Sequence, residues 1–173
     1  QYPLYTPGES LCAARQLGRS LLYAENARNI RITGGGTING NGLYRFKMND
    51  PKNDRENDSR PCAVYTAYCE NVRIDNLSFK NAAFWTVVPL SSRNVFMEHL
   101  DLDCMNTPNR DGIDPVDCVD MTIRKCRIMA GDDGLCLKSS DILGCENIFV
   151  SDLMIQSLAS GIKFGTDTYY SFR

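Results

Sequence analysis

Five segments of the chain share one pattern of apolar and polar positions. Each opens with Asn or Asp and continues as alternating apolar and polar residues, which is the periodicity of a β-strand. The segments begin at Asn29, Asn71, Asn94, Asp120 and Asn147, and the last four starts are 23, 26 and 27 residues apart. Short strands at this period, without a helical pattern, are typical of the coils of a parallel β-solenoid. We therefore predict an all-β solenoid in which the opening residues stack as a ladder of side chains at turns.

A second strand is expected in each coil, within residues 21–23, 62–65, 85–89, 112–116, 134–138 and 161–165. Aligning these strands gives one column that points into the core and one that points outward. The inward column is Val87, Ile113, Leu135 and Ile162, and the outward column is Val88, Asp114, Cys136 and Lys163.

The repeats indicate one domain, residues 1–173, made of the N-terminal and central coils of a β-helix. A polar segment at about 44–60 interrupts the repeats and has the composition of an insertion loop. A solenoid needs a cap over its last coil, and none is recognisable after Gly165. We therefore expect the C-terminal coils to be missing and the complete protein to be longer.

Charge and composition exclude several classes of function. The chain has 19 Lys and Arg against 21 Asp and Glu, a net charge of −2, so it lacks the basic excess of a nucleic-acid-binding protein. It has no apolar run long enough for a transmembrane helix. The single histidine, His99, excludes a zinc site of two Cys and two His, and it falls in a polar slot away from the acidic residues, which excludes a Ser-His-Asp triad there.

Most of the eight cysteines follow the repeat. Cys69, Cys118 and Cys145 each lie two residues before a ladder residue, and Cys126 shares a column with leucines. Because a free thiol packs like a small apolar side chain, we expect stacked core thiols and no disulfide between Cys118 and Cys145.

The strand alignment also brings carboxylates together. Asp111 and Asp133 fall in one column on adjacent coils, about one strand spacing apart, and Asp132 precedes Asp133. Crowded carboxylates disfavour ionisation, so one of them should keep its proton to higher pH. A protonated acid beside ionised carboxylates is what acid–base cleavage of a glycosidic bond requires. The alternative is that these residues only cap turns or bind Ca²⁺.

At these residues the sequence resembles glycoside hydrolase family 28, the pectin-degrading polygalacturonases. The family has an Asn-Thr-Asp motif and, about one coil later, an Asp-Asp motif, which read here Asn109-Arg110-Asp111 and Asp132-Asp133. The resemblance implies a right-handed, single-stranded parallel β-helix and an inverting mechanism. It also implies that Asp132 is the general acid, and that Asp111 and Asp133 hold and deprotonate the attacking water.

The sequence departs from the family pattern in three ways. Arg110 replaces the threonine of the first motif, Ser160 occupies the place of a family histidine, and the chain ends before the family's Arg-Ile-Lys motif. Lys138 and Lys163 are expected to point outward near the acids, where they could bind an anionic sugar or simply be solvated. Trp85 could stack on a sugar or pack in a strand. The candidate substrate-binding residues are Asn109, Arg110, Lys138, Ser160, Lys163 and Trp85.

The leading hypothesis is a hydrolase of pectin-like polysaccharide. It would act as an extracellular or periplasmic monomer, with no cofactor or metal and no nucleic-acid or membrane partner. A non-catalytic carbohydrate-binding β-helix is a second hypothesis, and it predicts glycan affinity without new reducing ends. A third is a β-helical polysaccharide lyase, which would use Ca²⁺ held by the same carboxylates and a Lys or Arg base.

Overall fold

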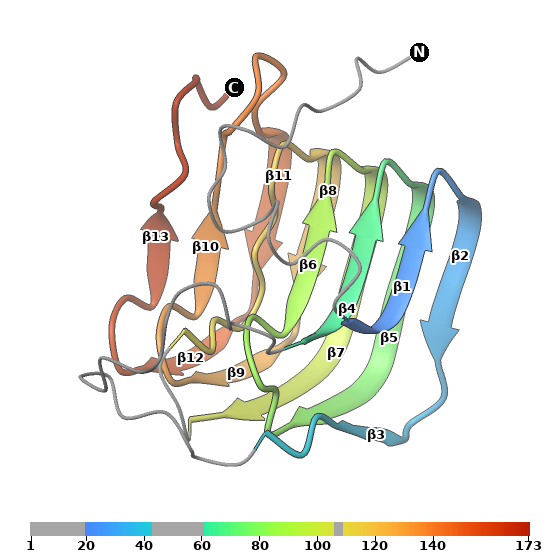
Figure 1. The fold of residues 1–173 in the computed structure, drawn as a ribbon, viewed down its shortest axis with the longest axis vertical. Helices are drawn as coiled ribbons and strands as arrows, with labels where there is room; N and C mark the ends of the chain where they lie inside the picture. The colour runs from blue at the N-terminus through green and yellow to red at the C-terminus, as the bar shows by residue number, and fades with distance from the viewer. Residues whose placement is uncertain (1–19, 43–60, 106–108) are drawn as a thin grey trace, which may run out of the picture.

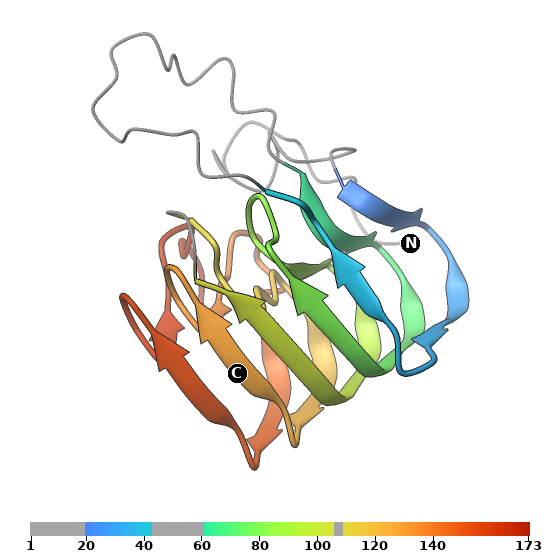
Figure 2. The same ribbon diagram turned by 90° about the horizontal axis from the view of Figure 1, so that it is seen from below.

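The computed structural model describes residues 20–42, 61–105 and 109–173. Within these ranges all regular secondary structure is β-strand, and every pair of neighbouring strands is parallel. The strands wind into the predicted right-handed parallel β-helix, whose coils stack side by side (Figure 2). No helix in the described ranges could cross a membrane. The insertion loop predicted at 44–60 lies outside the described residues.

One face of the β-helix holds the second strand of each coil (Figure 1). Its strands are β1 (Ser20–Glu25), β4 (Cys62–Ala67), β6 (Val87–Leu90), β10 (Leu135–Leu137) and β13 (Ile162–Phe164). Between β6 and β10, residues 112–116 continue the face through single bridges at Ile113 and Val116. Pro115 lies between these bridges and has no N–H to donate, which explains why the ladder is incomplete there.

The remaining strands form a larger sheet that bends around the rest of each coil (Figure 1). Its strands are β2 (Arg28–Thr33), β3 (Thr37–Asn39), β5 (Glu70–Lys80), β7 (Arg93–Cys104), β8 (Val119–Arg124), β9 (Arg127–Ala130), β11 (Glu146–Ser151) and β12 (Met154–Ser157). The bend falls at the polar slot that contains His99. His99 and its neighbours in that slot, Asn76, Lys125 and Asp152, all have φ of 52–53°.

The predicted inward column is confirmed in its register. Val87, Ile113 and Leu135 are bridged in sequence and fully buried, and Leu135 pairs with Ile162. Ile162 is 55% exposed because it lies on the last described coil.

The outward column is correctly aligned, but most of its members are buried and not exposed to solvent. Val88, Asp114 and Cys136 are each fully buried. Val88 belongs to a second apolar cluster on the outer side of the sheet, which includes Phe84 and Trp85. The outer side of this face therefore carries a packed layer of its own.

The ladder of opening residues is also confirmed. Asn71 donates a side-chain hydrogen bond to Asn29 at 3.1 Å, Asn94 donates to Asn71 at 3.2 Å, and Asn147 donates to Asp120 at 3.0 Å. All five residues have φ between 53 and 59°, the left-handed region. Asn and Asp tolerate this conformation better than other residues with a side chain, which explains the recurrence of these two residue types.

The seven described cysteines are free and buried, as the sequence predicted. The thiols of Cys69, Cys118 and Cys145 lie 3.2–3.4 Å from backbone carbonyl oxygens, to which they donate. Burial raises the pKa of each of these three thiols, so they are neutral core groups at ordinary pH.

The ladder predicts an order of stability for variants at Asn94. Asn94→Ala loses the amide hydrogen bond and also places alanine in a left-handed conformation, for a combined cost of about 1–3 kcal/mol. Asn94→Gly loses the same bond without the conformational cost and should lose only about 1 kcal/mol. Urea unfolding of both variants measures the difference, and an alanine variant at least as stable as the glycine variant would contradict this account.

Candidate active site

The predicted alignment of the acidic motifs is present in the structure. The backbone N–H of Thr86 donates to the Asp111 carbonyl at 2.9 Å, and the N–H of Gly112 donates to the Asp133 carbonyl at 2.9 Å. The next coil continues the same register, because Gly134 N–H donates to the Ser160 carbonyl at 2.8 Å. Trp85, Asp111, Asp133 and Ser160 therefore form one column across four coils.

The glycines after the two aspartates permit this close stacking. A Cβ atom at Gly112 would lie 2.4 Å from the Gly134 carbonyl oxygen, and one at Gly134 would lie 2.6 Å from the Gly161 carbonyl oxygen. These separations are far below van der Waals contact. The Asp-Gly pairs thus combine an acidic side chain with the one residue type that lets the neighbouring coil approach.

Asp111 and Asp133 meet at the start of the strands of this face. A carboxylate oxygen of each and the Cys136 Sγ atom all lie within 4.8 Å of one another. Asp111 is 4% exposed, and its burial and the nearby Asp114 carboxylate raise its pKa well above the ordinary value of an aspartate. A carboxyl group that keeps its proton to higher pH is what the sequence pattern predicts here.

Asp133 is bound by two donors from the following coil. The Lys163 ammonium group lies 2.7 Å from its Oδ2 atom, and the backbone N–H of Ser160 donates to Oδ1 at 3.1 Å. The bond to Asp133 raises the pKa of Lys163. Lys163 thus lies beside the acids as expected, and Ser160 contacts Asp133 through its backbone.

The Asp132 side chain is half-buried and makes a different set of contacts. Its Oδ2 atom accepts hydrogen bonds from the backbone N–H and the side-chain amide of Asn109, at 3.2 and 3.4 Å. Its carbonyl oxygen accepts a bond from the Ser157 hydroxyl at 2.6 Å. Asp132 is close enough to contribute to the raised pKa of Asp111, but Asn109 is its direct partner.

Three of the expected substrate contacts are buried. Arg110 is fully buried, and its Nη2 atom donates to the Gly42 carbonyl at 2.5 Å. Trp85 is 4% exposed and stacks on Phe84, with ring centroids 5.1 Å apart. The expectation that Lys138 lies at the surface is wrong, because this side chain is only 2% exposed.

Asp114 is a charged residue of this cluster to which the sequence pattern assigned no function. It is fully buried, and its Oδ1 atom lies 3.5 Å from the Lys138 ammonium group. Burial raises the pKa of Asp114, and Lys138 opposes that rise. The signal available in the sequence was its column, between Val88 and Cys136, where an acid is unexpected among apolar neighbours.

The donor set of Asp111, Asp133 and Cys136 is a poor fit for a metal ion. The Lys163 ammonium group already binds Asp133, and the Lys138 ammonium group lies 3.2 Å from the Cys136 sulfur. Burial and the Asp114 carboxylate raise the pKa of that thiol to about 12, so it is not a thiolate. Two fixed cations and a neutral thiol disfavour binding of a further cation.

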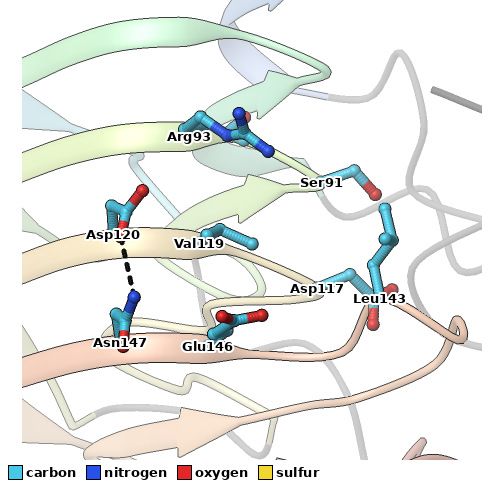
Figure 3. A pocket seen from close by; sticks show the side chains of 9 residues that line it. Ser91, Arg93, Asp117, Val119, Asp120, Leu143, Glu146 and Asn147 are labelled. Atoms are coloured by element: carbon cyan, nitrogen blue, oxygen red, sulfur yellow. Dashed lines mark hydrogen bonds between the residues drawn. The ribbon is translucent and has the colours of Figure 1, made fainter. Parts of the chain in front are cut away.

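A separate pocket of about 280 Å³ lies at the opposite end of these strands (Figure 3). Ser91, Arg93, Asp117, Leu143 and Glu146 contribute to its lining. Asp117 also fixes the adjacent loop, because its carboxylate accepts hydrogen bonds from the N–H groups of Ser140 and Asp141 and from the Ser140 hydroxyl. We assign this pocket to the turn that ends each strand and not to the acidic cluster.

Comparison with known proteins decides the family. The sequence profile described as glycosyl hydrolases family 28 matches residues 13–165. The chain belongs to glycosyl hydrolase family 28. It is 34% identical over 140 residues to a protein of Vitis vinifera named "Probable polygalacturonase", and this alignment covers 79% of the chain. It is 29% identical over 135 residues to "Polygalacturonase-2" of Solanum lycopersicum, with 75% of the chain covered.

Solved structures of family members show the same fold. A hyperthermoactive exopolygalacturonase of Thermotoga maritima aligns with a TM-score of 0.57 and 31% identity, covering 66% of this chain and 29% of that one. The polygalacturonase of Erwinia carotovora aligns with a TM-score of 0.72 and 22% identity, covering 88% of this chain and 44% of that one. The alignments of this chain span 28% of the length of the Vitis relative and 28% of the length of the Solanum relative.

The buried acids predict how stability depends on pH. A carboxyl group with a raised pKa keeps its proton in the folded state after the unfolded chain has released it, so the free energy of unfolding falls as pH rises above about 4. Asp111→Asn removes one such group. Urea unfolding at pH 5 and pH 8 should therefore show a smaller loss of stability in this variant than in the wild type.

The matched control is Asp103→Asn, which removes an exposed carboxyl group from β7. Its loss of stability between the two pH values should equal that of the wild type. If Asp111→Asn lost as much stability between pH 5 and pH 8 as the wild type does, the assignment of a raised pKa to Asp111 would be contradicted.

Proposed function

We propose that this chain carries the catalytic carboxylates of an inverting glycoside hydrolase that cleaves polygalacturonan or a related pectic glycan. The observation that carries the proposal is the stacking of Asp111 on Asp133, with Asp132 beside them and turned to a different partner. Membership of family 28 and the names of the Vitis and Solanum relatives support the substrate class.

The positions of the three carboxyl groups support a division of roles. Oxygens of Asp111 and Asp133 lie within 4.8 Å, which is shorter than the separation of about 6.5–9.5 Å between acid and base in inverting enzymes. These two residues therefore act on the same side of the sugar. Asp133, bound by Lys163, accepts a proton from the attacking water, and Asp111 orients that water.

Asp132 is then the general acid that protonates the leaving glycosidic oxygen. Its contacts with Asn109 come from the first motif, one coil away, and hold its side chain apart from the Asp111–Asp133 pair. Separation of the proton donor from the water-binding pair leaves space for the sugar between them, as inversion requires. In one turnover Asp133 takes one proton from the attacking water and Asp132 gives one proton to the leaving oxygen, so the total number of protons on the enzyme is unchanged.

The lysines near the site bear on substrate and on the rival chemistries. Lys163 is one-third exposed beside Asp133 and is the described cation best placed to meet a galacturonate carboxylate. Ca²⁺ held by the same acids, which the lyase hypothesis needs, would lie beside the ammonium groups of Lys138 and Lys163. The cluster therefore favours hydrolysis over a Ca²⁺-dependent lyase. Because pectic polymers occur outside the cytoplasm, we infer an extracellular or periplasmic enzyme, acting as a monomer.

The deciding experiment follows the anomeric configuration of the product by proton NMR, using the intact gene product and oligogalacturonates. We expect new reducing ends that appear first as the inverted anomer. A retained anomer would show that Asp111 and Asp133 act as an acid and nucleophile pair. An unsaturated product would show a lyase, and line broadening without cleavage would show a binding module.

Asp132→Asn tests the role of the acid. This change should lower kcat by about 10²–10⁴-fold because it removes the proton donor, and it should leave the unfolding midpoint nearly unchanged. Asp103→Asn, at an exposed position on another face, is the matched control and should retain full activity. Retention of more than a tenth of wild-type kcat by Asp132→Asn would overturn the assignment of this residue as the acid.

A further inference from the structure

A lysine is buried beneath the acidic cluster, where charged side chains are seldom found. Lys138 is 2% exposed, and its partner Asp114 is fully buried. The ammonium group also lies 4.4 Å from the centre of the Trp85 ring, and the Thr166 carbonyl oxygen is 3.5 Å from it. Burying a charged pair costs several kcal/mol per ion unless its contacts compensate, so this pair calls for an explanation.

Asp114 also interacts with Asp111. Burial and the charge of Asp114 raise the pKa of Asp111. The Cys136 sulfur connects the lysine to the acids above it, because it lies 3.2 Å from the Lys138 ammonium group and within 4.8 Å of a carboxylate oxygen of both Asp111 and Asp133.

Each lysine of the cluster pairs with one aspartate. Lys138 lies 3.5 Å from Asp114, and Lys163 lies 2.7 Å from Asp133. Burial would lower the pKa of Lys138, but the Asp114 carboxylate raises it above its ordinary value, so this lysine stays charged.

We propose that Lys138 is a positioning residue, whose buried ammonium group pairs with Asp114 beneath Asp111 and Asp133 and sets the charge that surrounds these two acids. This inference rests on the proposed function, since it assigns Lys138 to the support of Asp111 in the hydrolytic site. It replaces the expectation that Lys138 contacts the sugar. A lysine with 2% exposure acts on substrate only through the acids that it supports.

The titratable groups around Lys138 and Asp114 come from several coils. They are Asp111, Asp114, Asp133, Cys136, Lys163 and Asp167. Asp167, on the segment after β13, has a pKa raised by burial and opposed by Lys138. The next coil also limits space around the lysine, because a Cβ atom at Gly165 would lie 3.5 Å from the Lys138 nitrogen.

Removing either member of the ion pair has opposite consequences for Asp111. Lys138→Met keeps the length of the side chain and removes a positive charge, so Asp111 and Asp114 hold protons to higher pH. Asp114→Asn removes a negative charge and leaves Lys138, so Asp111 releases its proton at lower pH. A residue that only fills space would move the pH dependence in neither direction.

The test measures kcat/KM against pH on oligogalacturonates for the intact wild-type protein and both variants. We expect the profile to move to higher pH in Lys138→Met and to lower pH in Asp114→Asn. Lys138→Met should also lower kcat roughly 10-fold or more, with KM nearly unchanged. The control is Lys125→Met, an exposed lysine that pairs with Glu98 on another face, and its profile should match the wild type. Loss of activity without a shift, or shifts in the same direction, would overturn the proposal.

A second measurement keeps the inference independent of turnover. Urea unfolding at pH 5 and pH 8 should show a larger loss of stability in Lys138→Met than in the wild type, and a smaller loss in Asp114→Asn. If the wild-type protein is inactive but the stability losses follow this order, the hydrolase proposal is refuted and the electrostatic role of the Lys138–Asp114 pair stands. If the wild-type protein is active, but all three proteins lose equal stability between pH 5 and pH 8 and show the same pH profile of kcat/KM, the hydrolase proposal stands and the role of the Lys138–Asp114 pair is refuted.

Discussion

The site depends on the parallel register that places each coil directly above the previous one. Neighbouring strands are about 4.8 Å apart, so residues at equivalent positions on successive coils must lie against each other. Asp111 and Asp133 are such residues, and the glycine after each allows the backbones to reach that spacing. The electrostatic cost of placing two acids together is thus imposed by the fold, and the surrounding charges offset it.

Two lysines and one bound proton are the means of offsetting that cost. Lys163 reaches Asp133 from the rim of the site, whereas Lys138 reaches Asp114 from beneath it. A buried cluster of three carboxyl groups with no cations would not ionise readily, and one with three cations would leave no proton to hold. The arrangement seen here raises the pKa of Asp111, whereas Asp133 is bound directly by Lys163, so two chemically identical side chains differ because their environments differ.

Much of this fold could be predicted from the sequence because its repeat records the stacking directly. Asn71, Asn94 and Asn147 recur where the backbone needs a left-handed residue, and the Asp-Gly pairs recur where coils meet most closely. Aligning these signals gave the column of Asp111 and Asp133 without knowledge of the structure. The inward apolar column follows from the same alternation.

Burial on the outer side of the sheet was not predictable in this way. Alternation shows that Asp114 and Lys138 leave the core, but not that Trp85 from an earlier coil and Thr166 from a later one cover them. The partner of Asp132 was likewise hidden, since Asn109 reaches it from a turn whose geometry the repeat does not specify. These contacts join residues 23 to 53 positions apart, outside any local pattern.

The central claim is that stacking creates a cluster in which Asp111 stays protonated at neutral pH. Carbon-13 NMR titration of aspartate carboxyl groups in the intact protein, assigned with single Asp→Asn variants, tests it most directly. The account predicts a neutral carboxyl signal at pH 7 that disappears in Asp111→Asn. It would be contradicted if Asp111 and Asp114 both titrated in the ordinary aspartate range, near pH ~4.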